Sequence, residues 1–148
     1  MFELDNRSKR GIALDLTSEE GLEVALGLIA EADVFVTNLR IGALERLGLG
    51  AEHLCERFSR LVYCHITGYG REGDDADRAA YDVAAFWSRS GIAHLLTGPG
   101  GDPPFQRGGM GDHSTGISGA AAVSAALFAR ERTGEGQQIG RAPRWERV

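Results

Sequence analysis

The sequence has little of what several protein classes require. Lys9 is its only lysine, so the chain has no Walker A motif to hold nucleotide phosphates. Its two cysteines, Cys55 and Cys64, are too few for a disulfide framework, and a reducing compartment such as the cytoplasm is expected. No apolar run approaches the roughly eighteen residues of a membrane span, and the charged start MFELDNRSKRG is not a secretory signal. The formal net charge of −5 disfavours nucleic-acid binding, which needs a basic surface.

A metal site is also disfavoured by the spacing of the ligand-type residues. His53 and His65 lie near the two cysteines in the sequence, and these are side chains that bind zinc. However, neither cysteine belongs to a C-x-x-C pair, and Cys64 falls in a predicted buried strand. We therefore predict no metal.

The remaining composition is typical of one globular domain, with 148 residues, 43% of them hydrophobic and 25% charged. Strand and helix patterns alternate along the chain, which favours a parallel α/β sheet. We predict strands at 12–16, 34–37 and 61–67. A capping box with Thr17 as the cap and Glu20 as its partner predicts a helix that runs to about residue 32. Further helices are expected near 43–47 and 51–58, at 81–90, and from about 113 to 132.

Both ends of the chain look incomplete for a domain of this class. A doubly wound sheet usually opens with a strand and a nucleotide-binding turn, but few strands precede the long helix here. The tail GRAPRWERV has no pattern that would pack, and we expect residues 140–148 to be disordered. The predicted fold is a partial doubly wound, Rossmann-like sheet that ends in a long helix.

Residues 68–73 match G-x-G-x-x-G directly after a predicted strand, the pattern of a dinucleotide site. Asp74, Asp75 and Asp77 follow, where a pyrophosphate would need a positive helix end. No helix begins at once and no acidic residue lies about twenty positions further on. The dinucleotide interpretation is therefore rejected.

The most informative stretch is GGMGDHSTGISGAAAVSAALFARERTG, in which Asp112 lies between a glycine-rich turn and the predicted long helix. Gly108, Gly109 and Gly111 leave the backbone uncovered, so another molecule can approach it closely. The helix dipole stabilises a carboxylate at this end of a helix. From the residues alone, capping of the helix is favoured over catalysis, because aspartate is a preferred N-cap.

Two arginines are candidates for binding an anion. Arg40 follows the carboxyl end of a predicted strand, where open α/β sheets bind ligands, and Arg46 lies on the next short helix. Guanidinium groups suit phosphates, although exposure of both side chains to solvent explains them equally well.

Several segments together resemble the class III CoA-transferase family. They are NRSKRGIALDLTSEEG, ADVFVTNLRIGALERLGLG, RLVYCHITGYGREGDDADRAAYDVAAFWSRSG, GDHSTG and ARERTGEGQQI, in this order. The resemblance covers nearly all of residues 6–139. It implies that residues 1–139 form the central part of a large domain, without its N-terminal strand and small domain, and that residues 140–148 are a tail outside the family pattern. The family includes formyl-CoA and carnitine CoA-transferases and the α-methylacyl-CoA racemases.

The resemblance implies that Asp112, in the G-D-x-x-x-G pattern at 111–116, is a catalytic nucleophile. It would attack an acyl-CoA and pass through an aspartyl–acyl anhydride and an aspartyl–CoA thioester before a carboxylic acid accepts the CoA. Amides of the glycine turn would stabilise the oxyanions. The family is built of interlocked homodimers, so a homodimer is expected of the complete protein. The implied CoA contacts are Asn38, Arg40, Arg46, Lys9 and Arg10, and the implied active-site loop includes Gly98, Gly100, Gly101 and Gly111.

Two alternatives to a transferase remain open. Racemases of the family use a histidine together with the aspartate, but the matching position here is Tyr81, a poor base near neutral pH. A truncated remnant that only binds CoA or a partner chain, without turnover, is the second alternative.

Overall fold

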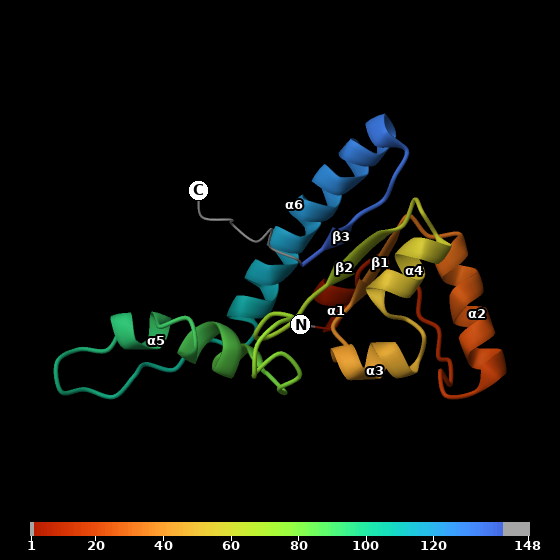
Figure 1. Ribbon diagram of the computed structural model, residues 1–148. Helices are drawn as coiled ribbons and strands as arrows, with labels where there is room; N and C mark the ends of the chain where they lie inside the picture. Colours follow the sequence, from red (N-terminus) through yellow and green to blue (C-terminus); the bar gives the residue numbers. More distant parts are fainter. Residues whose placement is uncertain (1, 141–148) are drawn as a thin grey trace. The chain divides into compact units, whose positions relative to one another are not determined.

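Two short strands, β1 (Val34–Thr37) and β2 (Val62–His65), lie side by side in the sheet of the computed structural model, which describes residues 2–140 (Figure 1). They pair in parallel, with Val34 opposite Val62 and Thr37 opposite His65. A third strand, β3 (Gln138–Ile139), pairs in parallel with the other edge of β2, which gives the order β1-β2-β3. The predicted parallel α/β sheet is confirmed.

The chain divides into two units, residues 1–31 and 32–148. The first holds α1 (Phe2–Asn6) and α2 (Glu19–Ala30). Ser18, not Thr17, is the N-cap of α2, because its hydroxyl accepts the Gly21 N–H at 3.1 Å. The Thr17 N–H and hydroxyl both donate to Asp15 instead, which lowers the pKa of that carboxyl. The predicted capping box is therefore wrong.

The strand predicted at 12–16 is also absent from the described residues. This segment is irregular, and Ile12 has an exposed fraction of 66%. Its alternation of residues suits a strand, but a strand also needs a paired neighbour, and no described segment pairs with it. The third strand of the sheet comes instead from Gln138–Ile139, which the sequence pattern did not predict.

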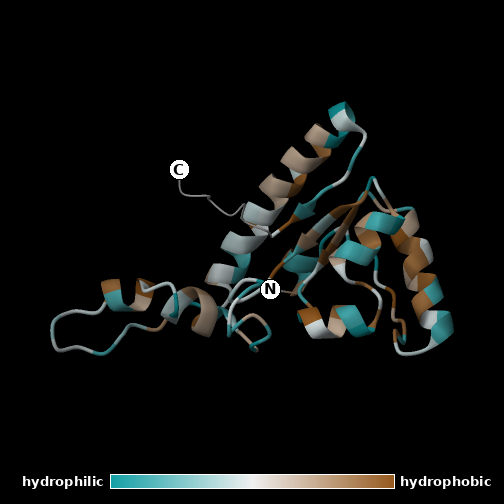
Figure 2. Cartoon of the chain, viewed as in Figure 1, coloured by the Kyte–Doolittle hydropathy of each residue, from teal (hydrophilic) through white to brown (hydrophobic). Residues whose placement is uncertain are grey.

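The core of the second unit lies around β2, which is buried at all four positions. Two helices, α3 (Ile41–Arg46) and α4 (Ala51–Arg57), contribute Leu44 and Leu54 to it. The Tyr63 hydroxyl donates to the Leu49 carbonyl at 3.0 Å, and burial raises the pKa of Tyr63 to about 12. Figure 2 shows hydrophobic colours along the strands, and on parts of the helices as well. The strand and helix predictions at 34–37, 43–47, 51–58 and 61–67 are confirmed to within a few residues.

The rest of the second unit consists of one long helix and a preceding irregular region. A π-helix, η1 (Val83–Ser88), replaces the helix predicted at 81–90, and a short α5 (Ile92–Leu95) follows it. The long helix α6 runs over Met110–Thr133, and thus begins three residues earlier than predicted. Both α4 and α6 contact β2 (Figure 1).

Arg130 fastens the C-terminal part of α6 to the strands. Its guanidinium donates to the Asp33 carboxylate at 2.7 Å and to the Arg60 carbonyl at 3.0 Å, and the side chain is almost fully buried. Asp33 and Arg60 lie just before β1 and β2. One side chain of α6 therefore holds the beginnings of both strands.

Within residues 2–140, no helix is long and apolar enough to cross a membrane. The tail predicted to be disordered lies, from residue 141 onward, outside the described residues.

Candidate active site

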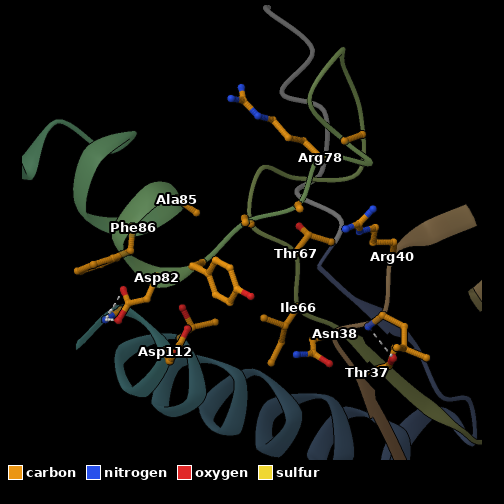
Figure 3. A pocket seen from close by; sticks show the side chains of 18 of the residues that line it. Thr37, Asn38, Arg40, Ile66, Thr67, Arg78, Asp82, Ala85, Phe86 and Asp112 are labelled. Carbon is orange, nitrogen blue, oxygen red and sulfur yellow. Dashed lines mark hydrogen bonds between the residues drawn. The ribbon is translucent and has the colours of Figure 1, made fainter. Parts of the chain in front are cut away.

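A pocket of about 790 Å³ lies at the carboxyl ends of β1 and β2. Three groups of residues line it: the end of β1 with the segment after it (36–41), the segment after β2 (66–68), and a region from Ala76 to Phe86 that leads into η1. The first turns of α6 complete it with Gly111, Asp112 and Thr115 (Figure 3). The carboxyl ends of parallel strands are where open α/β sheets bind ligands, so the place of the pocket fits a substrate site.

Asn38 and Arg40 lie in the wall of the pocket that β1 supplies. The Thr37 hydroxyl, in the last position of β1, accepts the Leu39 N–H at 3.2 Å. The Leu39 carbonyl lies 2.8 Å from His65 Nε2, and because a carbonyl only accepts, that nitrogen carries the proton. Thr37 and His65 are both buried. Two buried polar side chains therefore hold the backbone of Leu39, the residue between Asn38 and Arg40.

Asp112 lies in the opposite wall, in the first turn of α6, with its side chain exposed to the pocket (Figure 3). The N-cap of α6 is Gly109, in the left-handed conformation with φ of 82°, and it has no side chain to cap with. In the part of the chain that the structure describes, the Asp112 carboxylate accepts no hydrogen bond and forms no ion pair. The interpretation of Asp112 as a helix cap is therefore wrong.

Asp82, not Asp112, accepts a hydrogen bond from a backbone N–H at the start of α6. Both of its carboxylate oxygens accept the Gly111 N–H, at 3.0 and 3.1 Å (Figure 3). Asp82 is half-buried and precedes η1 directly. The pocket therefore contains two carboxylates, of which one is bound to backbone and the other is open.

The segment that carries the rejected dinucleotide motif adjoins the pocket, which its first residue, Gly68, lines. Asp75 pairs with Arg78 and with Arg89, each at 3.2 Å. Both guanidinium groups also lie 5.8 Å from the centre of the Tyr69 ring, a distance typical of cation–π contacts. This cluster ties the glycine-rich segment to the C-terminal end of η1 and places Arg78 in the pocket wall.

Four of the predicted site residues meet in this pocket. Asn38, Arg40, Gly111 and Asp112 all line it. Arg46 lies on α3 outside the lining, with a terminal nitrogen 3.5 Å from the place of a Cβ on Gly42. The segment with Gly98, Gly100 and Gly101 forms a turn closed by the Gly101 N–H and the Gly98 carbonyl, and is likewise outside the lining. Lys9 and Arg10 are exposed residues of the first unit.

The sequence patterns do not identify the residues that hold the site together. Asp82 lies 29 residues before Gly111, and no local pattern indicates a contact over that distance. Thr37 and His65 fall in predicted strands, and a polar residue at the carboxyl end of a buried strand is the signal that could have found them. Within the described residues, no three histidine, cysteine, aspartate or glutamate side chains lie close enough to hold a metal ion.

Comparison with known proteins finds one family and many similar enzymes. A family model described as CoA-transferase family III matches residues 1–143. The (R)-2-hydroxy-4-methylpentanoate CoA-transferase of Clostridioides difficile is 36% identical over 94% of this chain and 35% of its own length. The cinnamoyl-CoA:phenyllactate CoA-transferase of Clostridium sporogenes is 39% identical over 93% of this chain and 34% of its own length. Human succinyl-CoA:glutarate CoA-transferase is 39% identical over 88% of this chain and 30% of its own length.

Solved structures agree with these relatives. A CAIB/BAIF family protein from Brucella suis has 40% identity and a TM-score of 0.78, over 88% of this chain and 34% of that one. A Mycobacterium tuberculosis protein has 33% identity and a TM-score of 0.82, over 92% of this chain and 38% of that one. The chain thus spans about a third of the length of the proteins it matches.

Proposed function

Because this chain belongs to CoA-transferase family III, we propose that it contributes the nucleophile and part of the CoA site of an acyl-CoA:carboxylate CoA-transferase. The observation that carries the proposal is the Asp112 carboxylate: it is exposed in a pocket of about 790 Å³, and no described residue binds it. A buried or capped aspartate would be poorly suited to attack a thioester.

The proposed reaction begins when an Asp112 oxygen attacks the thioester carbonyl of an acyl-CoA. The C–S bond breaks, which gives an aspartyl–acyl anhydride and CoA thiolate. The thiolate then attacks the aspartyl carbonyl and releases the first acid as a carboxylate, which leaves an aspartyl–CoA thioester. The acceptor carboxylate attacks this thioester, and the freed thiolate attacks the new acyl carbonyl, so that a new acyl-CoA leaves and Asp112 is regenerated.

The described residues fit different parts of such a substrate. Arg40, with Arg78 across the pocket, offers positive charge for the phosphates of CoA, and Asn38 lines the same pocket. Because Asp82 already holds the Gly111 N–H, we assign oxyanion stabilisation to other amides of the 108–112 turn. Arg46, Lys9 and Arg10 as CoA contacts, the closing of the loop with Gly98, Gly100 and Gly101, and a homodimer of the complete protein stay predictions.

Trapping with hydroxylamine tests the nucleophile. The chain is incubated with succinyl-CoA or cinnamoyl-CoA, donors named for the relatives, and hydroxylamine is added. We expect an aspartyl hydroxamate at Asp112 by peptide mass spectrometry, because hydroxylamine attacks the activated aspartyl carbonyl. Asp112→Asn should give none, whereas Glu56→Gln, which removes an exposed carboxylate on α4 outside the pocket lining, should trap as the wild type does.

Two results would contradict this proposal. Binding of CoA without any hydroxamate at Asp112 would identify a remnant that binds but does not react. Exchange of deuterium at the α-carbon of a 2-methylacyl-CoA, without exchange of CoA between acids, would identify a racemase in which Tyr81 or another residue acts as the second base.

A further inference from the structure

Asp82 caps α6 from outside the helix. The first turn of a helix leaves its N–H groups without partners inside the helix, and a cap residue usually satisfies one of them. Gly109, the residue in the cap position, has no side chain for this purpose. Asp82 supplies the acceptor instead, from a position 29 residues earlier in the chain and with both oxygens near the Gly111 N–H.

The packing around Gly111 makes this contact specific. A Cβ on Gly111 would lie 2.3 Å from Asp82 Oδ1 and 2.3 Å from Phe86 Cγ. Both distances are far below contact distance, so only glycine allows η1 and the first turn of α6 to approach this closely. Gly111 is buried, although the residues after it on α6 are exposed. The first turn of α6 is therefore clamped against the start of η1.

Asp112 follows Gly111 directly, so the clamp also determines where the nucleophile lies. We propose that Asp82 is a positioning residue for Asp112: it takes the role of the helix cap and so leaves the Asp112 carboxylate facing the pocket. This inference rests on the proposed function, because it concerns how the same aspartate is presented to a thioester.

The alternative arrangement explains why the division of roles matters. Aspartate in the first turn of a helix is itself able to accept an N–H of that turn. Without Asp82, the Gly111 N–H would lack an acceptor, and Asp112 is the carboxylate in the adjacent position. An Asp112 side chain folded back onto its own helix would have one oxygen occupied and would point away from the substrate. Asp82 thus separates the structural carboxylate from the reactive one.

The experiment compares Asp82→Ala with Asp82→Asn in the 148-residue chain. Alanine removes the acceptor, whereas asparagine keeps one carbonyl oxygen and loses the charge. At saturating succinyl-CoA, Asp82→Ala should lower the rate of hydroxamate formation at Asp112 about ten- to a hundredfold. The dissociation constant for CoA should change less than about twofold, and Asp82→Asn should recover most of the rate. Glu56→Ala, which removes an exposed carboxylate on α4 outside the pocket lining, is the matched control and should trap at the wild-type rate.

Amide hydrogen exchange at Gly111 provides a second measurement that needs no catalysis. The Gly111 N–H should be protected in the wild type and in Asp82→Asn, and should exchange faster in Asp82→Ala. Equal loss of rate in both variants, or CoA affinity falling in parallel with the rate, would overturn the positioning role. A wild-type chain that gives no hydroxamate would overturn the proposed function instead, and unchanged Gly111 exchange in Asp82→Ala would contradict the anchoring by itself.

Discussion

The two walls of the pocket are built in different ways. The wall with Asn38 and Arg40 directly follows β1, and its backbone is fixed by Thr37 and His65, both at strand ends above the buried core. The wall with Asp112 stands at the end of a helix whose first turns are mostly exposed, and it is fixed by a contact from Asp82. We call these the binding wall and the chemical wall after their proposed roles. The binding wall is held by the sheet, whereas the chemical wall is held by one carboxylate and the close fit of one glycine.

This difference separates affinity from chemistry. If the proposed function holds, changes near the strand ends should act on CoA binding, because they move the residues proposed to face its phosphates. Changes near Gly111 should then act on the acyl-transfer step, because they move the proposed nucleophile, where small displacements are costly. Variants of the two walls therefore test whether the two effects are separate.

The largest effect is expected for Gly111→Ala. The added methyl group would overlap Asp82 and Phe86, so we expect a loss of about 1–3 kcal/mol in the free energy of unfolding. We also expect strongly reduced hydroxamate formation. Gly116→Ala is the matched control, because a Cβ there meets nothing within 4 Å, and it should stabilise the helix by about 0.5–1 kcal/mol. Urea unfolding and trapping measure both, and a Gly111→Ala chain as stable and reactive as Gly116→Ala would contradict the clamp.

The next effect is expected for Arg40→Gln, on the binding wall. Loss of a charged hydrogen-bond donor to phosphate should weaken CoA binding about ten- to a hundredfold, measured by calorimetry. Arg46→Gln is the comparison, since Arg46 lies outside the pocket lining, and it should weaken binding less than about fivefold. Wild-type affinity should also fall with added salt more steeply than that of Arg40→Gln. Equal losses in the two variants would place Arg46 in the CoA site as well.

The smallest effect is expected for Thr37→Val, which keeps the shape of the side chain but removes the acceptor of the Leu39 N–H. We expect CoA affinity to fall about two- to tenfold, because one neutral hydrogen bond is lost. The trapping rate at saturating acyl-CoA should not change. Thr133→Val loses a similar local hydrogen bond, to the Glu135 N–H at the far end of α6, and should leave CoA affinity unaltered. A fall in trapping rate with unaltered affinity would break the division between the walls.

Local patterns in the sequence predicted the binding wall better than the chemical wall. The buried run VFVT predicts β1, and an arginine just after such a strand falls at its carboxyl end, where the structure finds the pocket. The glycine-rich turn also indicates Asp112 as a site candidate, and its role as a nucleophile stays a prediction. Its interpretation as a helix cap is wrong, because the carboxylate that accepts an N–H of the first turn, Asp82, lies far away in the sequence. A contact between residues as far apart as Asp82 and Gly111 leaves no periodic signal.

Errors in the fold have a similar origin. The pattern at 12–16 has the residues of a strand, but pairing partners are not encoded locally, and the segment is irregular in the structure. Gln138 and Ile139 form a strand because they pair with the edge of β2 that β1 does not occupy. The side chains of these two residues do not indicate that pairing. Thr17 and Ser18 are adjacent hydroxyl residues, and either side chain can cap α2. Because the Thr17 hydroxyl donates to Asp15, Ser18 is the cap.

The position of Arg130 on α6 constrains the direction in which Asp112 points from the same helix. It lies about five full turns after Asp112, so the residue that grips the beginnings of the strands and the residue proposed to react point to the same side of the helix. Inserting a single residue between them would rotate one relative to the other by about 100°. The number of residues between Asp112 and Arg130 therefore determines the direction in which the Asp112 carboxylate, the proposed nucleophile, points.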